Sequence, residues 1–300
     1  MTSRPLDLIL VSTPIGGLGS GRGGGVELTL SSLLKGLVDR GHRVRLIAAE
    51  GSRLPEGYEA VDLLTAQGLD QPSWQHLDGE SPVLIPRAGL LPRFLDIALD
   101  VGAKADAVIN FGYDWLPLWI TPHVSQRLFH LISMGAVADV MRDQIETLAS
   151  WDQQRLAFHT ARQAADFRLP QQPRVVGNGF DLARYRFRQE ARGPLGWAGR
   201  VAPEKGLEDA AAAAAALGEQ LLVWGLREDP AYAEAVDAHS RWAGGGWTGK
   251  RVSQRVAPRG APKFVLYLVP HCAECRSVHR GDAGGGERGQ CGVHRRRGHL

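Results

Sequence analysis

Short apolar runs alternate with segments of helical periodicity along residues 1–240. This alternation is typical of a parallel β-sheet covered by helices, so it predicts an α/β fold. Residues 51–90 contain proline and glycine and show little periodicity, and we expect an irregular insertion there. We expect strands at Leu6–Val11, Val44–Ala48, Ala107–Asn110, Leu128–Ile132, Leu156–Phe158 and Arg174–Val176, and helices near 26–40, 91–101, 137–150 and 160–167.

A second unit of the same kind follows a boundary near Arg186–Pro194. It is expected to hold strands at Leu195–Ala198 and Leu221–Trp224 and helices near 206–217 and Pro230–His239. Three hundred residues allow two domains of ordinary size. We therefore predict a Rossmann-like domain over 1–190, the start of a second domain over 191–240, and a basic Gly/Arg-rich tail over 241–300.

A glycine-rich loop separates the first predicted strand from the first predicted helix. Seven of the ten residues from Gly16 to Gly25 are glycine. Strand, glycine loop and helix in this order bring backbone close to a ligand. The loop is neither a clean G-x-G-x-x-G fingerprint nor a Walker loop, because no Gly-Lys-Ser/Thr follows. A loop that is merely flexible is the alternative.

A second loop of interest follows the strand at Leu195–Ala198 and carries two cations, Arg200 and Lys205. A planar guanidinium grips phosphate oxygens, an ammonium adds a point charge, and the N-terminus of the next helix favours anions. This spacing suits a diphosphate. Ordinary surface charges ahead of an Ala-rich helix are the alternative interpretation.

The string from Leu195 to Asp209 resembles the donor-phosphate loop of retaining GT-B glycosyltransferases of family four. Gly24-Gly25-Val26-Glu27 resembles the Gly-Gly-x-Glu segment of these enzymes. With Asn110–Trp115, Phe129–Gly135 and Asn178–Asp181, the motifs over about residues 6–240 resemble one subgroup, the cyanobacterial UDP-glucose:tetrahydrobiopterin glucosyltransferases. The resemblance implies a GT-B fold and a hexosyltransferase that moves glucose from UDP-glucose to a small acceptor with retention, without a required metal or other cofactor.

The resemblance also implies roles for particular residues. Arg200 and Lys205 would hold the donor diphosphate, and the backbone of Gly23, Gly24 and Gly25 would approach the donor or the acceptor. Glu27 either orients a hydroxyl or caps its helix. His130 either contacts the sugar or acceptor as a catalytic residue or is a hydrogen-bonded core histidine. The acceptor would lie against Asp114, Tyr113 and Trp115, although aromatic residues at a strand end usually belong to the core.

Composition limits the partners that we expect. No apolar run approaches the ~20 residues of a membrane helix, and Asp7 interrupts the short first run, so we expect a cytoplasmic protein without signal peptide or membrane span. Residues 241–300 hold twelve Lys and Arg against three Asp and Glu, a net charge of +9. Because the whole chain carries +3, residues 1–240 carry −6, and we predict no nucleic-acid partner for them.

The tail beyond about Ser240 loses the alternating pattern and lacks the late Glu-rich segment of the family, so we expect an incomplete donor pocket and an inactive, truncated chain. Three interpretations are open. One is a Cys3His zinc site, and another is a basic arm around Arg295–Arg297 that contacts nucleic acid. The third, which we favour, is a shifted reading frame after about residue 240, with a tail that is largely disordered. The zinc ligands would be Cys272, Cys275, Cys291 and His294.

Overall fold

A computed structural model describes residues 4–72, 74, 85–181, 195–219, 221–225, 227 and 230–242, with the backbone alone at 204 and 237–242. None of the helices within these ranges combines the length and apolarity needed to cross a membrane.

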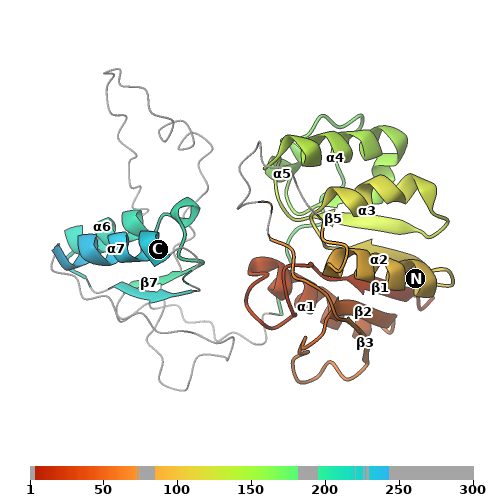
Figure 1. Ribbon diagram of the computed structural model, residues 1–300, viewed down its shortest axis with the longest axis horizontal. Helices are drawn as coiled ribbons and strands as arrows, with labels where there is room; N and C mark the ends of the chain where they lie inside the picture. Colours follow the sequence, from red (N-terminus) through yellow and green to blue (C-terminus); the bar gives the residue numbers. More distant parts are fainter. Residues whose placement is uncertain are drawn as a thin grey trace, which may run out of the picture. The chain divides into compact units, whose positions relative to one another are not determined.

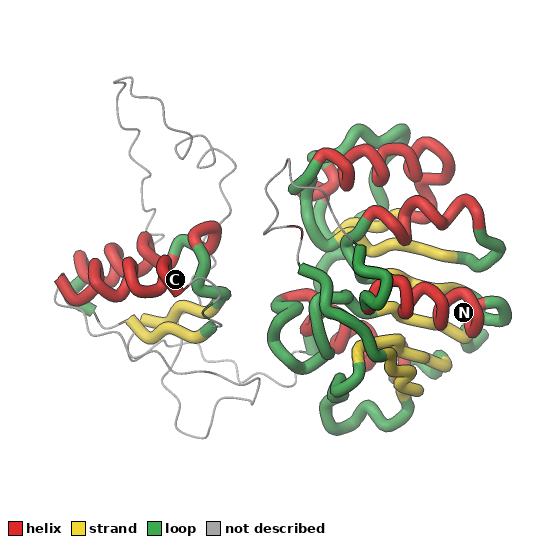
Figure 2. Tube along the Cα trace, viewed as in Figure 1, coloured by secondary structure: helices red, strands yellow, loops and turns green. Residues whose placement is uncertain are grey.

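The first part of the chain is a six-stranded sheet in which every neighbouring pair is parallel. The spatial order of the strands is β3-β2-β1-β4-β5-β6, with helices on both faces (Figures 1 and 2). This is the order of a Rossmann-type sheet, which confirms the expected α/β class. The strands are β1 Asp7–Val11, β2 Arg43–Ala49, β3 Val61–Ala66, β4 Ala107–Asn110, β5 Leu128–Ile132 and β6 Leu156–Phe158.

The helices between these strands are α1 Gly25–Val38, α2 Leu90–Gly102, α3 Trp115–Ile120, α4 Asp139–Asp152 and α5 Ala161–Ala164, with 3-10 turns η2 Thr121–His123 and η3 Gln153–Arg155. Side chains alternate across a strand, so β1 feeds two cores. Leu8 and Leu10 pack in the cluster that contains Leu34 of α1, whereas Ile9 and Val11 pack in the cluster that contains Phe94 of α2.

Two expectations for this part of the chain are wrong. Residues 61–66 form β3, although an irregular insertion was expected over 51–90. β3 is an edge strand with four of its six residues at least partly exposed, so its sequence lacks the continuous apolar run of the central strands. Residues 174–176, expected as a strand, make one bridge through Val175 to Phe158. Val175 and Val176 stay exposed, because only the edge of β6 is available for pairing.

The second part of the chain has the expected succession of elements. These are β7 Leu195–Ala198, a 3-10 turn η5 Pro203–Lys205, α6 Leu207–Ala216, β8 Leu221–Trp224 and α7 Pro230–Trp242. β7 and β8 pair in parallel, and Trp197, Leu207 and Val223 share one small core. The domain boundaries predicted near 190 and 240 remain predictions, since residues 182–194 and 243–300 lie outside the described ranges.

Candidate functional site

The strand order reverses between β1 and β4, and ligands of open α/β sheets bind beside the carboxyl ends of the strands at such a reversal. Two loops meet there. The amide of Phe111 donates to the carbonyl oxygen of Val11 over 2.9 Å. A Cβ on Gly112 would lie 3.6 Å from Cδ of Pro14. The loop after β4 therefore packs directly against the glycine loop that follows β1, as the order of strands requires.

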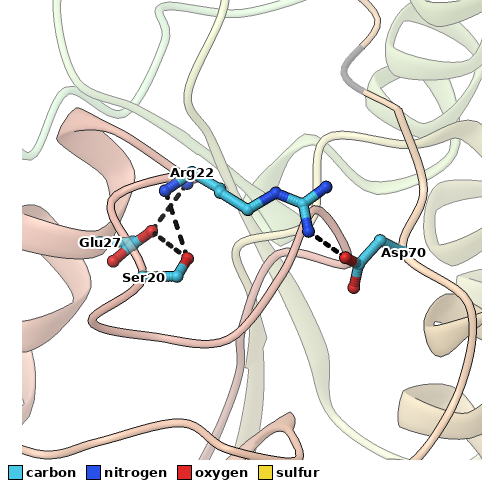
Figure 3. A network of polar contacts seen from close by, with 5 residues as sticks. Ser20, Arg22, Glu27 and Asp70 are labelled. Carbon is cyan, nitrogen blue, oxygen red and sulfur yellow. Dashed lines mark hydrogen bonds and ion pairs between the residues drawn. The ribbon is translucent and has the colours of Figure 1, made fainter. Parts of the chain in front are cut away.

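The glycine loop is organised around the carboxylate of Glu27, in the first turn of α1 (Figure 3). Oε2 accepts hydrogen bonds from the amides of Gly19 and Gly21 over 2.7 and 3.2 Å, and Oε1 accepts one from Gly23 over 2.7 Å. The Glu27 residue is 6% exposed. In this arrangement Glu27 neither points to a ligand nor merely caps its own helix, because it binds the preceding loop. Its catalytic role remains a prediction.

A segment that the sequence analysis did not single out, Asp70–Gln71, also binds the glycine loop. Arg22 forms an ion pair with Asp70 (Figure 3), and the amide of Gln71 donates to the carbonyl oxygen of Pro14 over 2.8 Å. The Gln71 side-chain amide also donates to Asp114 in the loop after β4. These residues lie in the stretch expected to be an irregular insertion, and no motif in the sequence marks them.

Asp114 caps α3 and is wholly buried. Its Oδ1 accepts from the amide of Leu116 over 3.1 Å, and its Oδ2 accepts from the indole N–H of Trp74 over 3.1 Å as well as from Gln71. Burial raises the pKa of the Asp114 carboxyl above its ordinary value, which opposes the lowering by these hydrogen bonds. Both oxygens are used by the protein itself, so acceptor binding by Asp114 remains a prediction.

The two aromatic neighbours of Asp114 contribute to the core under α4. The hydroxyl of Tyr113 donates to the carbonyl oxygen of Gly135 over 2.6 Å, and burial raises the pKa of Tyr113. Trp115 is partly buried against the same cluster, which includes Ile145 and Phe158. Packing thus accounts for both rings, as the alternative interpretation expected, and stacking on an acceptor remains a prediction.

His130 lies inside the sheet and is 1% exposed. Its Nδ1 lies 3.2 Å from the side-chain amide of Asn110, and its Nε2 lies 2.7 Å from the hydroxyl of Thr121. Burial, aided by the charge of Arg155, lowers the pKa of His130 to about 3. This is the arrangement of a hydrogen-bonded core histidine, the second of the two interpretations left open. A catalytic contact through His130 remains a prediction.

Arg200 and Lys205 lie in the segment between β7 and α6, where Lys205 is exposed and Arg200 is partly buried. Gly206 ends η5 and begins α6 with φ 61°, a left-handed conformation that suits glycine. Glu208 and Asp209 occupy the first turn of α6 and already complement its dipole. An anion here would therefore depend on the two cations more than on the helix.

Within the part of the chain that the structure describes, no group of three His, Cys, Asp or Glu side chains is placed to hold a metal ion. The alternative interpretations of the tail, a zinc site at Cys272, Cys275, Cys291 and His294 and a basic arm around Arg295–Arg297, concern residues outside the described ranges.

No protein-family model matches the chain, and no curated protein matches it significantly. Solved structures do match. AviGT4, a glycosyltransferase involved in avilamycin A biosynthesis, is 20% identical with a TM-score of 0.53, and the match covers 82% of this chain and 64% of AviGT4. OtsA is 12% identical with a TM-score of 0.48, and the match covers 82% of this chain and 73% of the OtsA chain. MurG of Acinetobacter baumannii is 16% identical over 82% and 66%, with a TM-score of 0.39. The likeness to AviGT4 concerns the fold, and this chain spans less than two thirds of that protein.

Proposed function

We propose that this protein belongs functionally with the GT-B glycosyltransferases and uses a nucleoside-diphosphate sugar, UDP-glucose in the first instance. Glucose would pass to a small acceptor with retention at the anomeric carbon. The observation that carries the proposal is the loop between β7 and α6, which places Arg200 and Lys205 directly ahead of a helix. The fold likeness to AviGT4 and the glycine loop at the sheet reversal support it.

The chemistry of transfer explains why two cations matter. As the sugar leaves, negative charge develops on the diphosphate, and fixed positive groups stabilise that charge. Arg200 supplies a planar fork for two oxygens and Lys205 a point charge. Both act without a metal ion, as the resemblance to family-four enzymes implies.

The acceptor is proposed from the sequence resemblance alone and is tetrahydrobiopterin. A flat ring that stacks beside Asp114 would reach Trp115 more readily than Tyr113, because Tyr113 is buried and its hydroxyl is bound to Gly135. A panel of pterin and sugar acceptors in the transfer assay is the direct way to identify the acceptor.

Calorimetry of UDP with the 300-residue protein tests the donor site. We expect binding that weakens by roughly tenfold or more in Arg200→Ala and in Lys205→Ala, since each removes a charged contact worth about 1.5–3 kcal/mol. Lys104→Ala, which removes an exposed lysine from the turn between α2 and β4, is the matched control and should bind as the wild type does. Equal UDP affinity in all four proteins would refute the assignment of this loop.

Release of UDP from UDP-glucose, measured with and without tetrahydrobiopterin, then separates catalysis from binding. Acceptor-dependent release would establish transfer by this chain. Because the 300-residue chain is expected to be inactive, the same assay is repeated on a protein with the proposed reading frame restored after about residue 240. Binding of UDP without release at any acceptor in that protein would favour the alternative of a non-catalytic nucleotide- or sugar-phosphate-binding protein.

A further inference from the structure

The carboxylate of Glu27 occupies a set of backbone amides that would otherwise bind an anion. The amides of Gly19, Gly21 and Gly23 converge on its two oxygens, and the hydroxyl of Ser20 lies 3.4 Å from Oε1. Successive backbone N–H groups that point into one turn form a concave anion site, often called a nest. Here three amides of alternate residues form a comparable concave site, for which we use the same name. In this protein the anion is a side chain of the same loop-helix unit (Figure 3).

The side chain of Glu27 packs tightly against the loop that it binds. A Cβ on Gly23 would lie 2.8 Å from Cγ of Glu27, closer than such atoms approach in proteins. The residue is 6% exposed, and its carboxylate is tethered by only two methylene groups. A phosphate would have to displace a charged group that is already desolvated, hydrogen-bonded and held at the site by the chain itself.

The outer side of the loop is fastened independently. Arg22 pairs with Asp70, but the side chains of both are substantially exposed, so the pair contributes little to stability. The buried contact to Glu27 is the stronger of the two restraints, because hydrogen bonds to a charged group in a dry environment are the costly ones to lose.

We infer that Glu27 is a positioning residue: an internal anion that folds the glycine loop and closes the amides of Gly19, Gly21 and Gly23 to ligand phosphates. The part of the loop that a ligand can approach is Gly24–Gly25, since a Cβ at either position would meet no described atom within 4 Å. The assignment of Gly24–Gly25 to the ligand rests on the proposed function, whereas the grip of Glu27 on the loop does not.

Replacement of Glu27 by alanine, with acetate as the probe, tests this role. In Glu27→Ala we expect the amides of Gly19, Gly21 and Gly23 to exchange with solvent roughly tenfold or more faster, while the amides of β1 and β2 keep their protection. Acetate, compared with chloride at equal ionic strength, should lower the exchange rates of these three amides again. It should also restore at least half of the decrease in the unfolding midpoint that the substitution causes. A loss of protection spread evenly over the sheet, with no effect of acetate, would overturn the inference.

Two further variants keep the test decisive. Glu59→Ala is the matched control, because Glu59 accepts a single glycine amide, that of Gly57, at an exposed site, and acetate should have no specific effect there. If Glu27→Ala does not fold in either salt, Glu27→Gln decides: its NH2 group cannot accept, so at least one of the three amides must lose protection. Unchanged protection of all three would contradict the role of the charge.

A separate experiment tests whether Glu27 closes the nest to other anions. Inorganic phosphate or UDP is added to the wild-type protein, and amide exchange is measured. The exchange rates of the amides of Gly19, Gly21 and Gly23 should stay unchanged at saturation, even where UDP binds through Arg200 and Lys205. A change at these three amides on addition of either anion would mean that the ligand displaces Glu27, and would overturn the closed nest. Failure of UDP to bind at all would count against the proposed function and leave the acetate result standing.

Discussion

The side-chain amide of Asn110 lies 3.2 Å from Nδ1 of His130, at a point where the two residues are direct partners on neighbouring strands β4 and β5. The same amide donates to the carbonyl oxygen of Gly112, so it is the donor toward Nδ1 as well. Nδ1 is then an acceptor and Nε2 carries the proton, which it donates to the hydroxyl of Thr121. Thr121 in turn donates to the carbonyl oxygen of Pro117. The chain of donors works only with a neutral imidazole.

A neutral His130 makes stability depend on pH in a defined direction. Its pKa is about 3 in the folded protein, against an ordinary value of 6.5 for histidine. Between these values the unfolded chain binds the additional proton, so this contribution is complete above pH 6.5 and is lost as the pH falls toward 3. We expect the free energy of unfolding to fall by about 1.4 kcal/mol per pH unit from this group alone.

Urea unfolding of the wild type and of His130→Gln at pH 7.5 and at pH 5 measures this contribution. The variant should be less stable at pH 7.5 but should lose less stability between the two values. Parallel pH dependence in the two proteins would show that the ring is accessible to protons in the folded state, as a catalytic histidine would be.

Asp114→Asn should destabilise the fold by about 1–3 kcal/mol at neutral pH, because one acceptor oxygen becomes an NH2 group that faces other donors. The three donors are Leu116, Trp74 and Gln71. Because the pKa of Asp114 is raised, its contribution to the free energy of unfolding is present below pH 3.8 and is lost as the pH rises through the folded-state pKa. The wild type therefore loses this contribution as the pH rises, whereas the variant does not. The deficit of the variant should therefore change with pH, and a constant deficit between pH 4 and pH 8 would speak against a titrating Asp114.

Gly23→Ala and Gly25→Ala form a matched pair within the glycine loop. The new methyl group at position 23 would lie 2.8 Å from Glu27, whereas that at position 25 would meet no described atom within 4 Å. We expect Gly23→Ala to destabilise by about 1–3 kcal/mol and Gly25→Ala to leave stability within about 0.5 kcal/mol. If the backbone of Gly25 approaches the donor, Gly25→Ala should still weaken UDP binding. Equal thermal midpoints for the two variants would contradict the first part.

Lys205→Ala should cut glucose transfer by roughly 10²-fold, about 2.7 kcal/mol of lost charge stabilisation in the transition state. If the reading frame shifts after about residue 240, as we propose, the present chain is inactive, and the experiment therefore uses a protein with that frame restored. Initial rates of UDP release are compared with those of Lys104→Ala. A rate that stays within about twofold of the control would show that the loop is only structural.

Local patterns were sufficient for most strands of both sheets and for the helices that flank them. Ala107–Asn110, Leu128–Ile132 and Leu195–Ala198 are strands with the expected bounds, because a buried parallel strand is a continuous apolar run whatever its neighbours are. The position of the glycine loop was equally predictable, since glycine content is a local property.

Tertiary structure alone decided what the polar residues do. Glu27 binds the loop before its helix, Asp114 is tied to Trp74 forty residues away, and His130 completes a network with Asn110 and Thr121. β3 pairs in parallel with β2, and this pairing joins it to the sheet as an edge strand. A side chain's role depends on which donors, acceptors and water surround it, and the parallel order of the strands brings those partners together from distant parts of the sequence.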